Sequence, residues 1–280
     1  ASFVNACGDL LFVPGLRMGV AGAAIATALS QLGGALFMTR ALFRNVLRPV
    51  LPAGAKMDLR PPSLRQAFNF TKFAGPIFFV NIGKFIPYTM ATVAVAGAGT
   101  LPLAAHQVIL GVYFVFVMFS EPMGQVFQAF LPDAKERGRP ATLGLVRRGL
   151  GMAGALSLIV AAAACLGPLL APFVFTNDIA VAEQMRYLVP LLFALIVPHP
   201  LTMAVEGILL SARDLKFLVG VYLANTAFVA AGMTAVAKLG LGVSGAWSCL
   251  IAWNVLRLTE QGSRLWFRRR RLLKLEPVSA

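Results

Sequence analysis

The stretch from residue 73 to residue 132 constrains the fold most, because it contains almost no charge. Its 60 residues include only two that are charged at neutral pH, Lys84 and Glu121. A helix needs roughly 20 apolar residues to cross the hydrocarbon of a bilayer, so this stretch can cross twice, with a turn near residues 97–102. Charged residues inside a membrane are tolerated where they face a protein interior or a wet cavity, and they often mark a transport site. We therefore expect a membrane transporter with Lys84 and Glu121 near its working centre.

The composition favours a protein that crosses the membrane several times. Hydrophobic residues make up 58% of the chain and charged residues 13%, which is too apolar for a soluble domain of 280 residues. The formal net charge of +14 does not indicate nucleic-acid binding, since the basic residues lie between apolar segments rather than among exposed polar and aromatic residues. The three cysteines are far apart within apolar runs, so neither disulfides nor a cysteine metal site is expected.

Eight apolar segments predict the helices. They span residues 3–13, 19–39, 73–98, 103–130, 149–175, 188–210, 217–237 and 241–256. The first is too short to cross a membrane, and the others should be helical because a chain in lipid must satisfy its own backbone hydrogen bonds. The predicted fold class is an all-α membrane protein with about seven full transmembrane helices and one truncated helix.

The basic residues predict how these helices are oriented. Of the 25 Lys and Arg residues, 21 fall in alternate loops, with seven in residues 40–72, five in 135–148, two in 213–216 and seven in 257–274. The positive-inside rule places these four loops together on the inner side of the membrane.

Two stretches of similar sequence indicate that the chain contains parts of two repeats. Residues 16–31 read LRMGVAGAAIATALSQ and residues 239–254 read LGLGVSGAWSCLIAWN, with Leu, Gly, Val, Gly and Ala matching at a constant offset of 223 residues. The spacing of six segments predicts a repeat of one six-helix bundle, and hence a twelve-helix protein with two lobes. We then expect about four and a half further helices, and any leader, ahead of Ala1.

The repeat also predicts domain boundaries. Residues 1–45 would be the end of an N-terminal lobe, and residues 46–72, which are basic and contain four prolines, would link the two lobes. Residues 73–270 would form the C-terminal six-helix lobe, with a tail from 271 to 280. An ordinary inner loop is the alternative to a linker.

Lys84, Glu121 and Glu206 are the first candidates for substrate binding or ion coupling. Lys84 lies between two helix-bending prolines and would attract an anion, or would form a structural ion pair with Glu121 or Glu206. A carboxylate in a low-dielectric cavity can bind and release a proton during transport, a role we expect for Glu206 or Glu121. A structural pair with Arg213 or Lys84 is the alternative for Glu206.

His199 and Asp9 complete the candidate set. His199 lies between two prolines, so its helix cannot be straight, and discontinuous helices line many transporter sites. A neutral, hydrogen-bonded role is the alternative for His199. Asp9 lies close to Asn5 in the truncated first segment and would face the cavity of the first lobe. The charged residues of the loop 213–216 are expected to pair with one another.

Motifs that the sequence lacks narrow the function. No GxxxxGK[ST] loop is present to hold ATP phosphates, so transport should be driven by an ion gradient. HExxH and GxSxG are also absent and the aspartates do not cluster, which disfavours a membrane-embedded enzyme. No cofactor and no metal site are expected.

Several motifs together resemble the MATE (multidrug and toxic compound extrusion) family. They are GVAGAAIAT at residues 19–27, LAAHQV at residues 103–108 and the repeat at an offset of 223 residues. Finer features resemble the plastid-envelope branch of the plant DETOXIFICATION proteins, which includes a salicylate or isochorismate exporter. These features are FAGPIFF at residues 73–79, Lys84, the pair Glu121 and Pro122, QAFLP at residues 128–132 and EGILLSARDLKF at residues 206–217.

The resemblance implies a central cavity and export of organic compounds in exchange for H⁺ or Na⁺ by alternating access. Bacterial members have an acidic residue near the position of Lys84, so their Na⁺ site is not expected here, and the positive charge favours an organic anion as cargo. The implied partners are a small organic substrate, H⁺ or Na⁺, and the lipid bilayer. The implied location is the plastid envelope, with the plasma or vacuolar membrane as alternatives.

Other functions are compatible with parts of this pattern. A lipid or lipid-linked-sugar flippase of the same superfold would have a similar helix count but would need a wider basic cavity. A channel or receptor fits less well, because a lobe repeat and buried titratable groups favour alternating access. An inactive fragment of a transporter is the third alternative.

Overall fold

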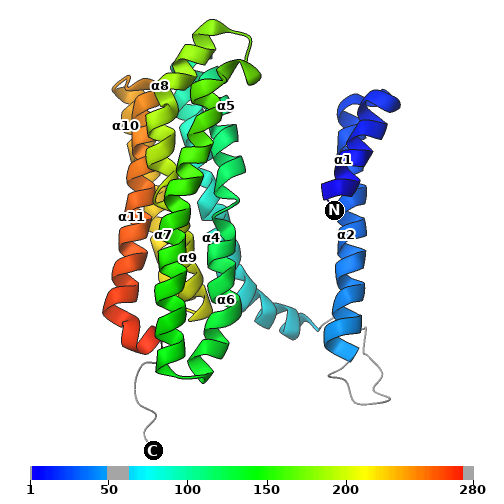
Figure 1. Cartoon of the computed structure of the whole chain (residues 1–280), viewed down its shortest axis with the longest axis vertical. Coiled ribbons are helices and arrows are strands. Elements are labelled where there is room, and N and C mark those ends of the chain that lie inside the picture. The colour runs from blue at the N-terminus through cyan, green and yellow to red at the C-terminus, as the bar shows by residue number, and fades with distance from the viewer. Residues whose placement is uncertain (1, 49–62, 274–280) are drawn as a thin grey trace, which may run out of the picture. The chain divides into compact units, whose positions relative to one another are not determined.

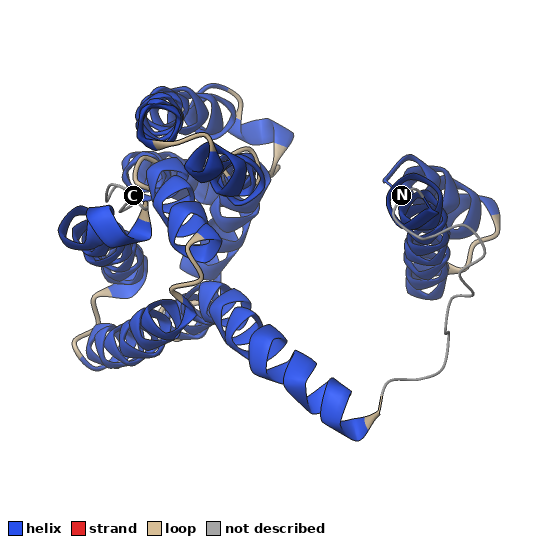
Figure 2. Ribbon diagram, turned by 90° about the horizontal axis from the view of Figure 1, so that it is seen from below, coloured by secondary structure: helices blue, strands red, loops and turns tan. Residues whose placement is uncertain are grey.

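The computed structural model describes residues 2–48 and 63–273, and all regular structure in these ranges is helical (Figures 1 and 2). The chain divides into two compact units, which we call unit 1 (Ala1–Ser63) and unit 2 (Leu64–Ala280). The predicted all-α fold class is therefore confirmed.

Unit 1 is a helical hairpin. α1 (Ser2–Leu10) continues into the π-helical turn η1 (Leu11–Gly15), and α2 (Gly19–Leu42) runs back and ends in a second π-helical turn, η2 (Phe43–Leu47). α1 and η1 together cover the predicted first apolar segment, residues 3–13.

Unit 2 is a helical bundle in which the chain runs along the long dimension of the bundle six times. Its elements are α4 (Leu64–Ala96), α5 (Thr100–Val117), α6 (Glu121–Glu136), α7 (Arg139–Leu170), the short η3 (Pro172–Val174), α8 (Ile179–Ile196), α9 (His199–Ser211), α10 (Leu215–Lys238) and α11 (Gly242–Leu272). α5 with α6, and α8 with α9, each form one interrupted crossing. Figure 2 looks along the bundle and shows the helices of unit 2 nearly end on.

The helices have the length and composition of membrane spans. Within the described residues, six segments qualify: Gly19–Asn45, Ala74–Ala96, Thr100–Glu136, Arg139–Leu170, Ile179–Ser211 and Leu215–Lys238. α11 does not qualify although it has 31 residues, because Asn254 and Arg257 interrupt its apolar sequence. Together with α11 these segments make seven long helical spans, which matches the prediction of about seven. The protein is therefore a multi-pass integral membrane protein.

Two of the crossings are broken near their middle. The apolar segment 188–210 was expected to bend at its prolines, and it is interrupted between α8 and α9, just before His199. The prediction of a continuous helix over 103–130 is wrong, because α5 ends at Val117 and α6 restarts at Glu121. Pro122 has no backbone N–H to continue the ladder of α5, but it fits the first turn of a new helix.

Glycines let the helices of unit 2 approach closely. A Cβ atom added to Gly207 of α9 would lie 2.6 Å from the Cα of Gly124 in α6, so the two backbones are in direct contact there. A Cβ atom at Gly83 of α4 would lie 2.8 Å from the ring of Tyr222 in α10. These two positions fix α9 against α6 and α10 against α4, since only glycine leaves enough room.

The two stretches of similar sequence, residues 16–31 and 239–254, also share their backbone conformation. Three features at the start of α2 recur at the start of α11 with the offset of 223 residues. They are the positive φ angles of Arg17 and Gly240 (54° and 63°), those of Gly19 and Gly242 (55° and 60°), and the hydrogen bonds from Gly22 N to Met18 O and from Gly245 N to Leu241 O (3.4 and 3.2 Å). The last helix of each unit therefore begins with the same turn.

The basic loops of unit 2 lie at one end of the bundle, as predicted. The connections after α6 and after α9 and the end of α11 are together at the lower end of unit 2 in Figure 1. Arg257 is the exception, because it was assigned to the inner loop 257–274 and is instead buried within the bundle. The reason is that α11 continues for fifteen residues beyond it, to Leu272.

The predicted linker and tail are partly helical. α4 begins at Leu64, so residues 64–72 of the expected linker belong to a helix, and no proline between Pro62 and Pro76 interrupts it. α11 likewise includes two residues of the expected tail. Residues 46 and 47 of the expected linker belong to η2, and residues 49–62 and 274–280 lie outside the described residues.

The contact between α6 and α9 predicts a large effect of one substitution. Gly207→Ile should destabilise unit 2 by about 1–3 kcal/mol or more, because the added side chain forces two backbones apart. Gly220→Ile is the matched control, since Gly220 of α10 faces open space. Thermal unfolding in detergent measures both, and equal midpoints for the two variants would contradict the close packing.

Candidate functional site

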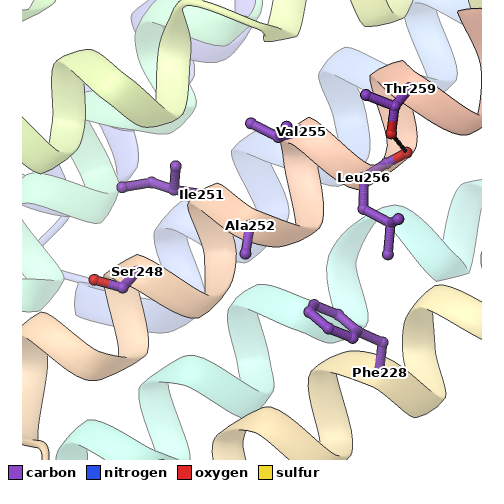
Figure 3. Close-up of a pocket in the computed structure, with 7 residues that line it drawn as sticks. All are labelled: Phe228, Ser248, Ile251, Ala252, Val255, Leu256 and Thr259. Carbon is purple, nitrogen blue, oxygen red and sulfur yellow. Dashed lines mark hydrogen bonds between the residues drawn. The ribbon is translucent and has the colours of Figure 1, made fainter.

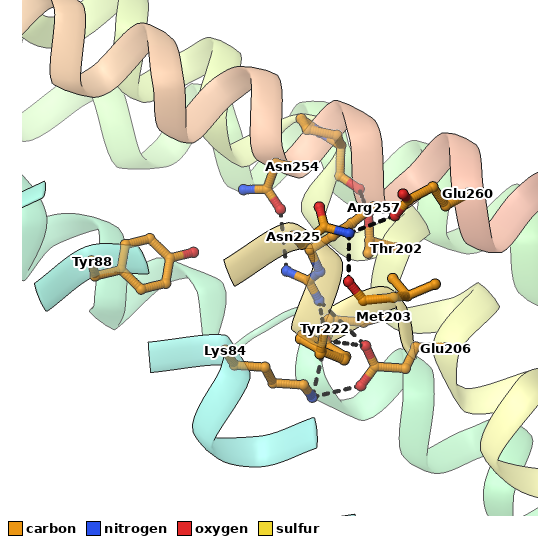
Figure 4. Close-up of polar contacts among 12 residues, drawn as sticks. Lys84, Tyr88, Thr202, Met203, Glu206, Tyr222, Asn225, Asn254, Arg257 and Glu260 are labelled. Carbon is orange, nitrogen blue, oxygen red and sulfur yellow. Dashed lines mark hydrogen bonds and ion pairs between the residues drawn. The ribbon is translucent and has the colours of Figure 1, made fainter. Parts of the chain in front are cut away.

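A single buried carboxylate joins four helices in unit 2. Glu206 of α9 is 2% exposed, and its Oε1 lies 2.7 Å from the ammonium of Lys84 in α4. Its Oε2 accepts a hydrogen bond from the hydroxyl of Tyr222 in α10 at 2.5 Å and one from Nη2 of Arg257 in α11 at 3.3 Å (Figure 4). We call these four residues the Glu206 cluster.

Arg257 is the most enclosed cation of the cluster. It is 1% exposed, and its guanidinium carbon lies 5.1 Å from the ring centre of Tyr222 and 4.9 Å from that of Trp253. Nη2 donates to the Tyr222 hydroxyl at 2.7 Å, and Nη1 donates to Asn254 Oδ1 at 3.4 Å. The aromatic rings and hydrogen bonds hold the guanidinium in one orientation, which a flexible lysine would not keep.

Lys84 is the accessible member of the cluster. Its side chain is 20% exposed. Among the residues that the structure describes, the ammonium contacts Glu206 and, at 3.9 Å, the thioether sulfur of Met203. An ammonium can form three hydrogen bonds, and a thioether is a weak acceptor. Lys84 therefore has donor capacity left for a further acceptor.

The charges of the Glu206 cluster do not cancel. Two cations share one carboxylate, so the buried group carries one net positive charge at neutral pH when all three residues are ionised. Burying a charge without a partner is costly, and the cluster keeps the cost down by pairing both cations with the same carboxylate. Chemically, such a cluster can accept an anion, and protonation of Glu206 would release both cations from it.

The structure brings together only part of the predicted site. Lys84 and Glu206 form the structural ion pair that was one of the alternatives. The alternative pair of Lys84 with Glu121 is not formed, because Glu121 is the exposed first residue of α6 and has no ion pair among the described residues. His199 is buried at the start of α9 with its ring 6.1 Å from that of Tyr113, and neither ring nitrogen has a partner within the described part of the chain.

The expected ion pairs in the loop 213–216 are not formed. Asp214 instead binds Arg264 of α11 through two contacts, 2.8 Å from Nε and 3.2 Å from Nη2. Arg213 adopts a positive φ of 57° in the tight turn between α9 and α10. The pairing of Arg213 with Glu206 is therefore also wrong, since Lys84 and Arg257 occupy that carboxylate.

Asp9 belongs to unit 1 and has its own polar contacts. One carboxylate oxygen accepts a hydrogen bond from Asn5 at 3.0 Å, and Asn5 in turn accepts one from Ser30 of α2 at 3.4 Å. The other oxygen of Asp9 is buried without a partner in the described residues.

Sequence reasoning missed two of the four residues in the cluster. Arg257 was assigned to the inner loop 257–274, and Tyr222 carries no charge that would mark it within an apolar segment. A usable signal was present, because Arg257 follows Asn254 by one helical turn. Polar residues one turn apart on an apolar helix indicate a buried face.

Two apolar grooves lie away from the cluster. The first, of about 510 Å³, runs between α10 and α11 and is lined by Phe228, Ser248, Ile251, Ala252, Val255, Leu256 and Thr259 (Figure 3). The second, of about 480 Å³, lies between α5 and α7. Within the described residues, no group of three or more His, Cys, Asp or Glu side chains is arranged to hold a metal ion.

Comparison with known sequences finds plant relatives. No family model matches the chain. It is 29% identical over 260 residues to Protein DETOXIFICATION 47, chloroplastic, of Arabidopsis thaliana, covering 91% of this chain and 46% of the relative. It is 27% identical to Protein DETOXIFICATION 43 and 25% identical to Protein DETOXIFICATION 45, chloroplastic, of the same plant, with 92% of this chain covered in each case and 47% and 45% of the relatives. The chain thus spans about half the length of these curated relatives.

Comparison with solved structures finds the same fold. A MATE protein crystallised in complex with MaD5 matches with a TM-score of 0.74 and 18% identity, over 98% of this chain and 60% of that one. An outward-facing multidrug resistance MATE family transporter of the MOP superfamily matches with a TM-score of 0.73 and 18% identity, over 99% and 61%.

The hydroxyl of Tyr222 should contribute measurably to stability. Tyr222→Phe removes a donor to Glu206 and an acceptor for Arg257, both buried, and should cost about 1–3 kcal/mol. Tyr187→Phe is the control, since Tyr187 is exposed and its hydroxyl accepts a hydrogen bond from Ser244 at 3.3 Å on the surface. Denaturant or thermal unfolding in detergent gives both values, and a Tyr222→Phe protein as stable as the control would contradict the cluster geometry.

Proposed function

The homologues of this chain are DETOXIFICATION (MATE) proteins and its fold is that of MATE transporters, and from this we propose that the protein works as a secondary active antiporter. It exports small organic anions in exchange for H⁺, with Na⁺ as the other possible coupling ion, by alternating access. In this proposal unit 2 is the second lobe of a two-lobe transporter, and the two helices of unit 1 are the end of the first lobe. The protein is a transporter rather than an enzyme.

The net positive charge of the Glu206 cluster is the observation that carries the choice of an anion. Lys84 is partly exposed, pairs with Glu206 and has hydrogen-bonding capacity left. An organic carboxylate that binds Lys84 would interact with two cations, Lys84 and Arg257, which share the single carboxylate of Glu206. Charge-assisted hydrogen bonds of this kind are about twice as strong as neutral ones.

Protonation of Glu206 provides the coupling step. With Glu206 ionised, Lys84 is held by its carboxylate at 2.7 Å. A proton on that carboxylate would weaken the ion pair between α4 and α9, and would so favour the change of access in which the cargo leaves Lys84. The cargo then binds the unprotonated cluster and leaves the protonated one, so cargo and proton move in opposite directions. This difference in contacts between the two states is what a conformational cycle requires.

The relatives support a location in the plastid envelope. Two of the three relatives described above are chloroplastic by name, and a further one, Protein DETOXIFICATION 44, chloroplastic, is 24% identical over 276 residues. In that membrane the basic loops of unit 2 would face the stroma, following the positive-inside rule.

Loss of the Lys84 charge should weaken the binding of anionic substrates. In proteoliposomes carrying the intact protein, Lys84→Met should raise the KM for organic anions about tenfold or more, because one charge-assisted hydrogen bond is lost. Lys84→Arg should keep most of the affinity. Uptake of matched organic anions and cations, driven by an imposed pH gradient, measures the effect.

Lys238→Met is the matched control for this experiment. Lys238 is exposed at the last residue of α10, at the other end of the bundle, so its loss changes the net charge equally without touching the cluster. An unchanged KM in Lys84→Met would overturn the role of Lys84. Uptake by the unmodified protein that does not change with the pH gradient would overturn proton-coupled antiport.

A further inference from the structure

The last turns of α11 extend beyond the hydrocarbon of a bilayer. α11 has 31 residues, so at about 1.5 Å per residue it is about 46 Å long. The hydrocarbon core is about 30 Å thick, which about 20 residues cross. With Gly242 at the outer surface, the final ten or so residues, from about Ser263 to Leu272, lie at the level of the inner lipid headgroups.

This end of α11 is fixed to the bundle. Arg264 binds the carboxylate of Asp214 through two contacts, and its guanidinium carbon lies 4.8 Å from the ring centre of Phe217 in α10. Leu265 and Leu272 are buried on the same side of the helix. The outward-facing residues of these turns are therefore held at a constant depth and orientation relative to unit 2.

The outward-facing residues are aromatic and basic. Trp266 is 64% exposed and Phe267 is 83% exposed, and four consecutive arginines follow, all of them exposed. The guanidinium carbon of Arg269 lies 4.4 Å from the ring centre of Trp266. We call this surface the α11 collar, made of Trp266, Phe267, Arg268, Arg269, Arg270 and Arg271.

The arginines of the α11 collar form no ion pair within the described part of the chain. Among residues 2–48 and 63–273, no carboxylate forms an ion pair with any of the four. Asp214, which lies against this end of α11, already pairs with Arg264. Basic residues in a last turn also complement the helix dipole, but that effect fades within one turn and does not require four of them.

We infer that the α11 collar is a binding site for anionic lipid headgroups. The exposed rings of Trp266 and Phe267 suit the boundary between acyl chains and headgroups, where aromatic residues gather. The arginines then lie beside the headgroups, and a guanidinium can bind a phosphate or sulfate group through two parallel hydrogen bonds. Clusters of four or more basic residues directly inside a transmembrane helix attract anionic lipids in general. The site binds lipid independently of the transported cargo.

Trp266 provides a direct reporter for this site. The other two tryptophans, Trp247 and Trp253, are fully buried, so the fluorescence difference between the intact protein and its Trp266→Phe variant isolates the collar. In proteoliposomes, a brominated anionic lipid at a low mole fraction should quench this signal more strongly than the same fraction of a brominated neutral lipid with identical chains. Equal quenching by the two lipids would overturn the proposal.

A charge-matched pair of variants separates lipid binding from net charge. Arg268→Gln, Arg269→Gln, Arg270→Gln and Arg271→Gln together should lower the apparent affinity for the anionic lipid at least about fivefold, which is the effect of one basic residue near an anionic surface. The control removes four other inner-side arginines: Arg137→Gln, Arg139→Gln, Arg147→Gln and Arg148→Gln. The affinity of this control variant for the anionic lipid, measured by quenching of Trp266, should stay close to that of the unmodified protein.

Two results would contradict the inference. An equal loss of affinity in both quadruple variants would mean that net charge, rather than the α11 collar, attracts the lipid. Displacement of the anionic lipid by inorganic phosphate at an equal concentration would mean that the site binds a free anion and not a headgroup in a membrane.

Discussion

The ion pair network at Glu206 is the interaction on which unit 2 depends. One buried carboxylate holds the ammonium of Lys84, the guanidinium of Arg257 and the hydroxyl of Tyr222, and so joins α9 to α4, α10 and α11. Without that carboxylate Arg257 would be a buried cation with no ion pair, at a cost of several kcal/mol, and the partly exposed Lys84 would lose its ion pair. The register of these four helices is therefore set by polar contacts, while the glycine contacts determine how closely the helices approach.

The interrupted crossings place backbone breaks beside this network. α8 and α9 separate just before His199, two turns from Glu206, and α5 and α6 separate at Ser120. Ser120 and His199 are buried, and their side-chain nitrogen and oxygen atoms have no partner in the described part of the chain. In transporters generally, breaks of this kind let packed helix segments rearrange.

Much of the fold could be predicted from the sequence, and the site only in part. Apolar length and loop charge indicated the spans and their orientation, because lipid imposes both. The pairing of Lys84 with Glu206 was foreseen as an alternative, since a buried charge needs a partner. Arg257 was misplaced because a single basic residue at the edge of an apolar run has the same pattern whether the helix ends or continues. The break at Glu121 was missed because Pro122 can either bend a helix or start one.

A double-mutant cycle on Lys84→Met and Glu206→Gln tests the central claim most directly. Each variant alone leaves a buried charge with fewer partners, whereas the double variant removes both members of the pair. Unfolding free energies in detergent should therefore be non-additive, with the double variant less destabilised than the sum of the two single variants by about 1 kcal/mol or more. Additive values would contradict the account, because they would mean that Lys84 and Glu206 do not interact in the folded protein.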